Sequence, residues 1–132
     1  MRIRKVTPVL VVEAVEPCVE FWTTRLGFEL TNSVPEGERL GFAILARDGV
    51  ELMYQSVDSV AKDVPQILAG GSRSLRAALF FEVEDLDAFE RALAGVRPLT
   101  PRRKTFYGAD ELIVSDPAGN TITFAQFASQ PA

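Results

Sequence analysis

The chain contains 132 residues, of which 47% are hydrophobic and 24% charged; this is typical of one globular domain and excludes a disordered or fibrous protein. The formal net charge of −4 argues against general nucleic-acid binding, and no apolar run reaches the roughly 20 residues that a membrane span needs. A lone cysteine, Cys18, and a basic start with no signal-peptide pattern behind it indicate a cytoplasmic protein.

Local patterning predicts a strand and then a helix at the start of the chain. Lys5 to Val12 is apolar and β-branched, as a buried strand requires. A helix is expected from Glu16 to Gly27, because apolar residues recur along one helical face at Val15, Val19, Trp22 and Leu26. This stripe favours core packing for Trp22 over ligand stacking, and Cys18 is likewise expected to pack.

Three strands and a short helix are expected to complete the first half. The strands fall at residues 28–31, 40–46 and 50–57, with a loop of turn-forming residues over 32–37. Asp48-Gly49 predicts a tight hairpin between the last two strands. A short helix over 60–68, interrupted by Pro65, leads to Gly70-Gly71, which mark the best internal boundary.

The second half repeats this order of elements. It predicts a strand over 75–83, a helix over 86–94 and short strands at 96–99, 110–115 and 120–127. The segment from Val12 to Val15 aligns with the segment from Val83 to Leu86 at an offset of 71 residues. The predicted architecture is therefore an α+β fold of two βαβββ modules, residues 1–70 and 71–132, within a single domain.

Short motifs occur in a fixed order along the chain: Val11-Val12-Glu13-Ala14-Val15, Phe21-Trp22, Leu26-Gly27-Phe28-Glu29-Leu30, Tyr107-Gly108, Glu111-Leu112 and Asp116-Pro117-Ala118-Gly119-Asn120. Together they resemble the glyoxalase/bleomycin-resistance/extradiol-dioxygenase superfamily, also called vicinal oxygen chelate. The resemblance implies that each module curls its sheet into half of a cup, that function lies in the concave groove, and that the protein is a homodimer.

In the metalloenzymes of that superfamily, the first and fourth strands of each module supply metal ligands. The resemblance places these positions at Thr7, Glu51, Ala78 and Thr123. Because the chain has no histidine, only Glu51 could bind a divalent ion well. We therefore predict no catalytic metal, no cofactor and no catalytic residues. The alternative is an oxygen-only site for magnesium or manganese, in which a carboxylate such as Glu82 is an additional ligand.

The resemblance is closest to the bleomycin-resistance-like branch, which implies that a flat or cationic antibiotic is bound without a metal. Strand alternation, with additions from neighbouring strands, predicts the groove residues Thr7, Val9, Phe42, Glu51, Met53, Ala78, Phe80, Phe106, Leu112 and Thr123. This lining is mainly apolar with one carboxylate, which suits a planar or cationic organic ligand. A collapsed interior filled by the same side chains is the competing interpretation.

Three functions follow from these observations. The first is metal-independent sequestration of a small molecule by a homodimer, with neither nucleic acid nor membrane as a partner. The second is a lyase, isomerase or dioxygenase with an oxygen-only metal site, and the third is a scaffold subunit whose cup is filled. The basic run Arg102-Arg103-Lys104 is expected to be a solvated loop, with an anion site as the weaker interpretation.

Overall fold

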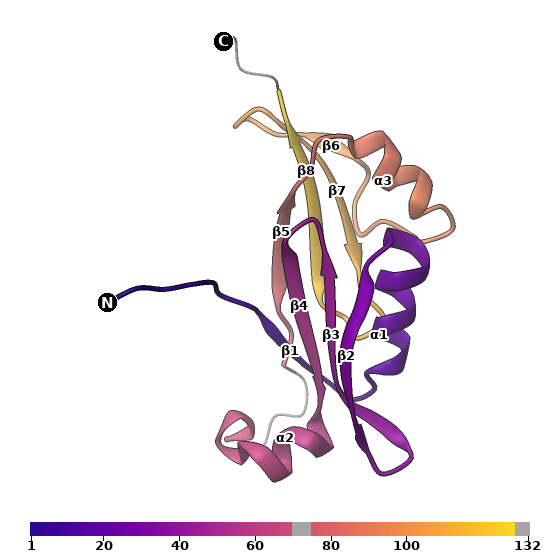
Figure 1. Cartoon of the computed structure of the whole chain (residues 1–132). Helices are drawn as coiled ribbons and strands as arrows, with labels where there is room; N and C mark the ends of the chain where they lie inside the picture. The colour runs from indigo at the N-terminus through magenta and orange to yellow at the C-terminus, as the bar shows by residue number, and fades with distance from the viewer. Residues whose placement is uncertain (70–74, 129–132) are drawn as a thin grey trace. The chain divides into compact units, whose positions relative to one another are not determined.

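Two four-stranded sheets, one in each half of the chain, organise the computed structural model of this protein (Figure 1). The structure describes residues 1–69 and 75–128. The chain divides into two compact units, Met1–Arg76 and Ala77–Ala132, whereas the expected boundary at Gly70-Gly71 lies outside the described residues. The predicted α+β fold with two modules is confirmed.

The sheet of the first unit has the strand order β1-β4-β3-β2. Strand β1 runs parallel to β4, and the other neighbours are antiparallel. The elements of this unit are β1 (Val9–Val12), α1 (Glu16–Glu20), the π turn η1 (Phe21–Arg25), β2 (Glu29–Glu36), β3 (Arg39–Arg47), β4 (Val50–Ser56), α2 (Val57–Asp63) and the 3-10 turn η2 (Pro65–Leu68).

The hairpin between β3 and β4 forms at the predicted Asp-Gly pair. Asp48 and Gly49 are the two residues between the strands, and their φ angles are 52° and 78°. Positive φ at both central positions is the type I′ turn, whose twist matches that of the flanking strands. The turn sets a register in which Ala46 pairs with Glu51 and Ile44 with Met53.

The core of the first unit lies between this sheet and the helical segment α1-η1. Trp22 is fully buried, and its indole N–H donates to the hydroxyl of Tyr54 at 2.8 Å. The core interpretation of Trp22 and of the fully buried Cys18 is confirmed. The predicted stripe is wrong at Val19, which is only half-buried while Phe21 is buried. The buried side of this segment is formed instead by Val15, Cys18, Phe21 and Trp22.

The loop predicted over 32–37 is wrong, because β2 continues through these residues to Glu36. Strand β2 lies at the edge of its sheet, so the missing N–H of Pro35 costs no ladder hydrogen bond on the outer side. Register shifts between Leu30 and Asn32, and between Val34 and Pro35, accommodate the turn-forming residues as bulges. An edge strand thus tolerates a composition that reads as a loop.

The second unit repeats the topology of the first, with the strand order β5-β8-β7-β6. Strand β5 runs parallel to β8, and the other neighbours are antiparallel. Its elements are β5 (Ala78–Glu82), α3 (Leu86–Ala92), β6 (Arg103–Lys104), β7 (Ala109–Ser115) and β8 (Thr121–Phe127). None of the helices in residues 1–69 and 75–128 has the length and apolarity needed to cross a membrane.

The strand predicted over 96–99 is wrong, and the corresponding strand is the short β6. Leu99 donates one backbone hydrogen bond to Ile113 at 2.9 Å, but no ladder forms around it. Pro101, two residues after Leu99, lacks the N–H group that would make the next bond to β7. Pairing with β7 begins only at Arg103, which lies opposite Glu111.

Candidate functional site

Each sheet has one face packed against a helix and an opposite face that we call the open face. In β3 and β4 every second residue is buried, and in the second unit Phe124 stacks on Phe89 of α3 at a centroid distance of 5.0 Å. The residues between the buried ones therefore point to the open face. On the first unit they include Met53, whose neighbours in the ladder are Val9 and Ile44.

The five groove residues predicted on the first unit lie on or beside its open face, but they are spread along it, because Phe42 lies opposite Gln55, next to Val11 and away from Glu51. Val9 is 46% exposed, whereas Phe42 and Met53 are half-buried on the adjoining strands. Thr7 precedes β1, and its hydroxyl donates to the carboxylate of Glu51 at 3.1 Å. These side chains form an apolar surface with one carboxylate at its edge.

Helix α2 closes one end of this open face. Val11, which alternation also directs there, forms a buried cluster with Val57 and Val60 of α2. Leu68 and Leu75 pack partly against the cluster. The surface accessible to a ligand is therefore confined to the part of the sheet near Val9.

Glu51 is held by two donors from the segment before β1. The Lys5 ammonium donates to its carboxylate at 2.9 Å, and the Thr7 hydroxyl adds the second bond. The Lys5 contact, aided by Thr7, holds the pKa of Glu51 below its usual value of 4.5. At neutral pH Glu51 is therefore a carboxylate paired with a cation that is itself 65% exposed.

This donor set does not fit the divalent metal that the superfamily implies. Thr7 and Glu51 supply one hydroxyl and one carboxylate already paired with Lys5, and the matching positions Ala78 and Thr123 supply a methyl group and a hydroxyl. Among the residues that the structure describes, no group of three or more His, Cys, Asp or Glu side chains could hold a metal. A catalytic zinc or iron needs about three strong protein ligands.

We expect Lys5→Ala to raise the pKa of Glu51 towards its ordinary value, because the largest stabiliser of the carboxylate is removed. The folded-state pKa lies below the unfolded one, so the stability from this contact is present above the unfolded pKa and is lost as the pH falls through the folded pKa. Carbon-13 NMR titration of the glutamate side chains measures the change. Arg4→Ala is the control, since Arg4 does not shift Glu51; an equal effect of both variants would contradict the assignment.

The predicted groove residues of the second unit divide between three places. Ala78, Phe80 and Thr123 lie on the open face, where Phe80 pairs with Thr123 in the ladder and is 55% exposed. Leu112 does not join them, because it pairs with Phe124 on the helix-covered face and is 3% exposed. Phe106 lies in the hairpin between β6 and β7 and is completely exposed.

Sequence reasoning missed a row of aromatic side chains on the second unit. The ring of Phe80 lies 6.3 Å from that of Phe127, and Phe127 lies 6.1 Å from Tyr107. Phe106 continues the row, at 5.1 Å from Tyr107. Alternation from Thr123 along β8 could have identified Phe127, but only the hairpin geometry brings Tyr107 to it. These four rings we call the aromatic row.

A buried carboxylate lies beneath one end of the aromatic row. Glu111 of β7 is 2% exposed and pairs with Ala125 of β8. One of its oxygens accepts the Tyr107 hydroxyl, and the other accepts from Nε and Nη2 of Arg103 at 3.3 and 3.2 Å. Tyr107 and Arg103 therefore satisfy both oxygens of a charge that has almost no contact with water.

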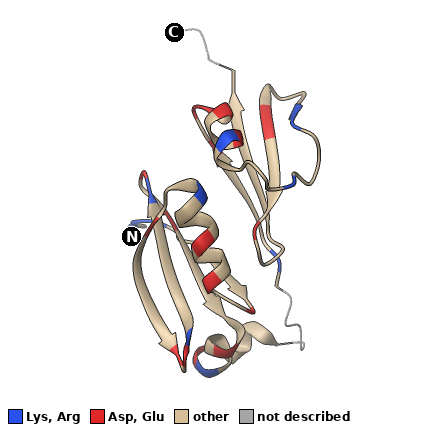
Figure 2. Cartoon of the chain, turned by 90° about the vertical axis from the view of Figure 1, so that its right-hand side faces the viewer, with Lys and Arg blue, Asp and Glu red and all other residues tan. Residues whose placement is uncertain are grey.

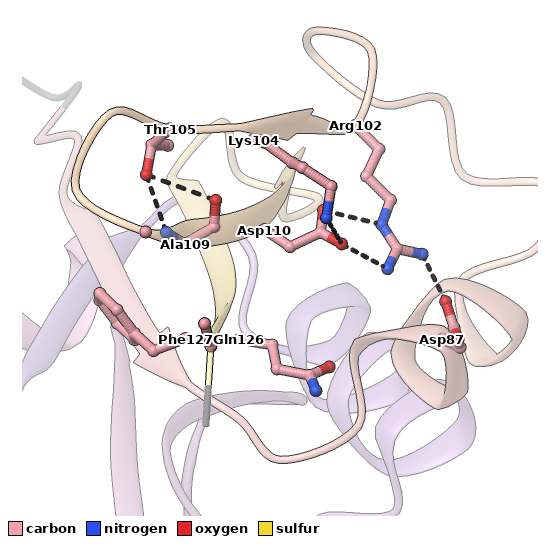
Figure 3. A pocket seen from close by; sticks show the side chains of 10 residues that line it. Asp87, Arg102, Lys104, Thr105, Ala109, Asp110, Gln126 and Phe127 are labelled. Carbon is pink, nitrogen blue, oxygen red and sulfur yellow. Dashed lines mark hydrogen bonds and ion pairs between the residues drawn. The ribbon is translucent and has the colours of Figure 1, made fainter. Parts of the chain in front are cut away.

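A cavity of about 440 Å³ lies beside α3, lined by Asp87, Arg102, Lys104 and Asp110 among others (Figure 3). Arg102 donates to both oxygens of Asp110, at 3.1 and 2.9 Å, and to Asp87 at 2.7 Å. These bonds raise the pKa of Arg102 and lower that of Asp110. The solvated-loop expectation is wrong in two respects, because Arg103 and Lys104 form strand β6 and the Arg102 side chain is only 25% exposed. The side chain of Lys104 is solvated, at 87% exposed.

The remaining basic residues are distributed over several elements. In Figure 2 the lysines and arginines occur singly or in short groups on loops, helices and strand ends, interspersed with acidic residues. The chain carries 14 basic and 18 acidic residues, so this distribution does not favour the neutralisation of many phosphates.

Several solved structures are similar to this chain over nearly its whole length. A bleomycin-binding protein from bleomycin-producing Streptomyces verticillus, complexed with copper(II)-bleomycin, has 26% sequence identity and a TM-score of 0.65, covering 98% of this chain and 99% of that one. TioX from Micromonospora sp. ML1 has 17% identity and a TM-score of 0.77, covering 95% and 99%. Lactoylglutathione lyase from Agrobacterium tumefaciens has 14% identity and a TM-score of 0.74, covering 95% of each chain. The last two show the fold alone.

A search of curated proteins found no match. The model of the Glyoxalase/Bleomycin resistance protein/Dioxygenase superfamily, however, matches residues 3–124. This match includes the first sheet and most of the second, ending at Phe124 within β8. The chain therefore belongs to the glyoxalase/bleomycin resistance protein/dioxygenase superfamily.

Proposed function

We propose that this protein binds a planar or cationic organic molecule on the open face of a sheet, without a catalytic metal, as the bleomycin-resistance-like branch does. The aromatic row carries the proposal. Phe80, Tyr107 and Phe106 are 55%, 46% and 100% exposed. Exposed rings that lie close together are costly in water and provide π faces for a flat ligand, which supports a binding surface here.

Glu51 supports the cationic part of the proposal. Its carboxylate lies beside the exposed Val9 strand and is paired with an ammonium group on a side chain that is 65% exposed. A ligand cation could replace Lys5 without leaving a buried charge unpaired, because the Lys5 ammonium would return to water. The 26% identical structure holding copper(II)-bleomycin lends the antibiotic class further support.

Titration calorimetry with bleomycin and with a mitomycin tests the proposal. Measurable binding is expected for at least one compound, and Phe80→Ala is expected to weaken it by about tenfold or more, as for an aromatic anchor at an interface. Ile67→Ala is the matched control, because Ile67 is an exposed apolar side chain on η2, outside the sheets. Absence of heat with both compounds, or equal binding by both variants, would count against the proposed surface.

We further propose that the protein is a cytoplasmic homodimer. The exposed edge strand β2, which includes the apolar Leu30 and Val34, supports an interface with a second copy. Native mass spectrometry of protein purified without chelators reports the subunit number and any bound metal together. A metal-free dimer is expected, whereas stoichiometric manganese or zinc would favour the metal-dependent lyase, isomerase or dioxygenase.

A further inference from the structure

The hydroxyl proton of Tyr107 is used in a hydrogen bond to a buried carboxylate. The hydroxyl donates to Glu111, whose carboxylate is 2% exposed and whose other oxygen is engaged by Arg103. The phenol carries a single proton, so the oxygen can offer only lone pairs to any further partner. Half of the Tyr107 side chain nevertheless remains on the surface, next to the exposed ring of Phe106 and the half-buried ring of Phe127.

We propose that Tyr107, held by Glu111, acts as an obligate hydrogen-bond acceptor and selects flat aromatic ligands that carry an N–H or O–H donor at their edge. This inference rests on the proposed function and adds the chemical class of its ligand. Tyr107 would contact the ligand, whereas Glu111 would act as a positioning residue through Tyr107.

The surroundings of the phenol agree with this assignment. The bond to Glu111 and the burial of the hydroxyl raise the pKa of Tyr107, while the nearby Thr105 hydroxyl and Arg103 oppose the rise. The Thr105 hydroxyl accepts from the backbone N–H of Ala109 at 3.0 Å and donates to its carbonyl at 3.4 Å. Tyr107 therefore stays neutral at physiological pH, and its orientation is set by a carboxylate that cannot turn towards solvent.

A matched pair of probes separates acceptor selection from stacking. Indole and benzofuran are fused bicycles of nearly the same shape, but indole has an N–H donor where benzofuran has an oxygen. Their dissociation constants are measured by NMR titration on wild type and Tyr107→Phe, which keeps the ring and removes the acceptor. The preference for indole over benzofuran is expected to be about two- to tenfold larger in wild type, the effect of one net hydrogen bond. The same preference in both proteins would overturn the proposal.

Glu111→Gln tests the positioning role. The oxygen of the introduced glutamine can accept from Arg103. The amide N–H₂ of the same side chain then points towards the phenol oxygen of Tyr107. Tyr107 then receives a hydrogen bond and its own proton becomes free, so the preference for indole is expected to fall to the Tyr107→Phe level or below. Retention of the wild-type preference in Glu111→Gln would overturn the role of Glu111.

Ultraviolet titration of tyrosine ionisation checks, without any ligand, that Glu111 is coupled to Tyr107. Tyr107 is identified by the signal lost in Tyr107→Phe, since Tyr54 is the other tyrosine of the chain. Its pKa is expected to fall in Glu111→Gln, and an unchanged pKa would refute the coupling. If wild type binds bleomycin or a mitomycin but neither probe, or binds both probes without the expected preference, only the selection fails. If it binds none of the four compounds, the proposed function fails as well.

Discussion

Trp22→Ala is expected to lower the free energy of unfolding by about 3–5 kcal/mol, the cost of removing a large buried aromatic side chain. Trp22 is completely buried, and its ring contacts Phe28 at a centroid distance of 4.8 Å and Phe21 at 5.5 Å. The substitution also removes the indole N–H that donates to Tyr54, which is itself fully buried. Because the free energy of unfolding of a domain is only about 5–15 kcal/mol, the substitution would remove a large part of it.

Urea denaturation followed by circular dichroism measures this loss. Trp22→Phe separates the two contributions, because it keeps an aromatic ring in the core and removes the N–H and part of the volume. The loss for Trp22→Phe is expected to be clearly smaller than for Trp22→Ala. An alanine variant as stable as wild type would show that the segment α1-η1 does not pack on the sheet as described.

Asp116→Ala is expected to destabilise the protein by about 2–4 kcal/mol, because it removes three hydrogen bonds to one buried carboxylate. One oxygen accepts from the backbone N–H groups of Ala118 and Asn120 at 3.0 and 2.8 Å. The other accepts from the Asn120 side chain at 2.9 Å. Asn120 is 1% exposed, so its amide groups could not turn to water for replacement partners.

The effect of Asp116→Ala should spread beyond its own turn. The Asn120 side-chain oxygen accepts from the backbone N–H of Ala77 at 2.7 Å, immediately before β5, so the carboxylate indirectly orders the parallel pairing of β5 with β8. Amide hydrogen exchange on β5 should accelerate together with the fall in the urea midpoint. Glu84→Ala, which removes an exposed carboxylate from the same unit, is the control and should change stability little. Similar stabilities for the two variants would contradict this role.

The motif from Asp116 to Asn120 illustrates how a sequence signature differs from a site. It helped to identify the superfamily, yet in the structure its polar side chains bond to one another and to Ala77. Its contribution is the geometry of the β7–β8 turn. The residues that carry the proposed ligand chemistry, Tyr107 and Glu111, belong to the neighbouring motifs.

Elements governed by local patterning were predicted well. The β3–β4 hairpin forms at Asp48-Gly49, and Trp22 faces the core. The 71-residue repeat also holds, since β8 begins 71 residues after β4, at Thr121 and Val50 respectively. In each case the determining interactions involve residues that are close in the sequence, or a repeat visible along it.

Elements that depend on a distant partner were predicted poorly. Strand β2 forms because β3 supplies a ladder for residues that otherwise favour a loop. Leu112 was assigned to the groove as an addition from a neighbouring strand, but its pairing with Phe124 places it against the helix instead. A shift of the pairing register by one residue moves every side chain of a strand to the opposite face of the sheet. A side chain therefore cannot be assigned to a face until its partner strand is known.

By itself the sequence determined the superfamily, the two βαβββ modules and the presence of a single carboxylate among the expected ligand positions, because residue identity and periodicity are properties of the linear chain. Only the tertiary structure decided that Lys5 pairs with Glu51, that α2 covers Val11, and that a buried Glu111 holds Tyr107 in the aromatic row. Those contacts depend on strand register and hairpin shape, which are set by hydrogen bonds between residues far apart in the chain.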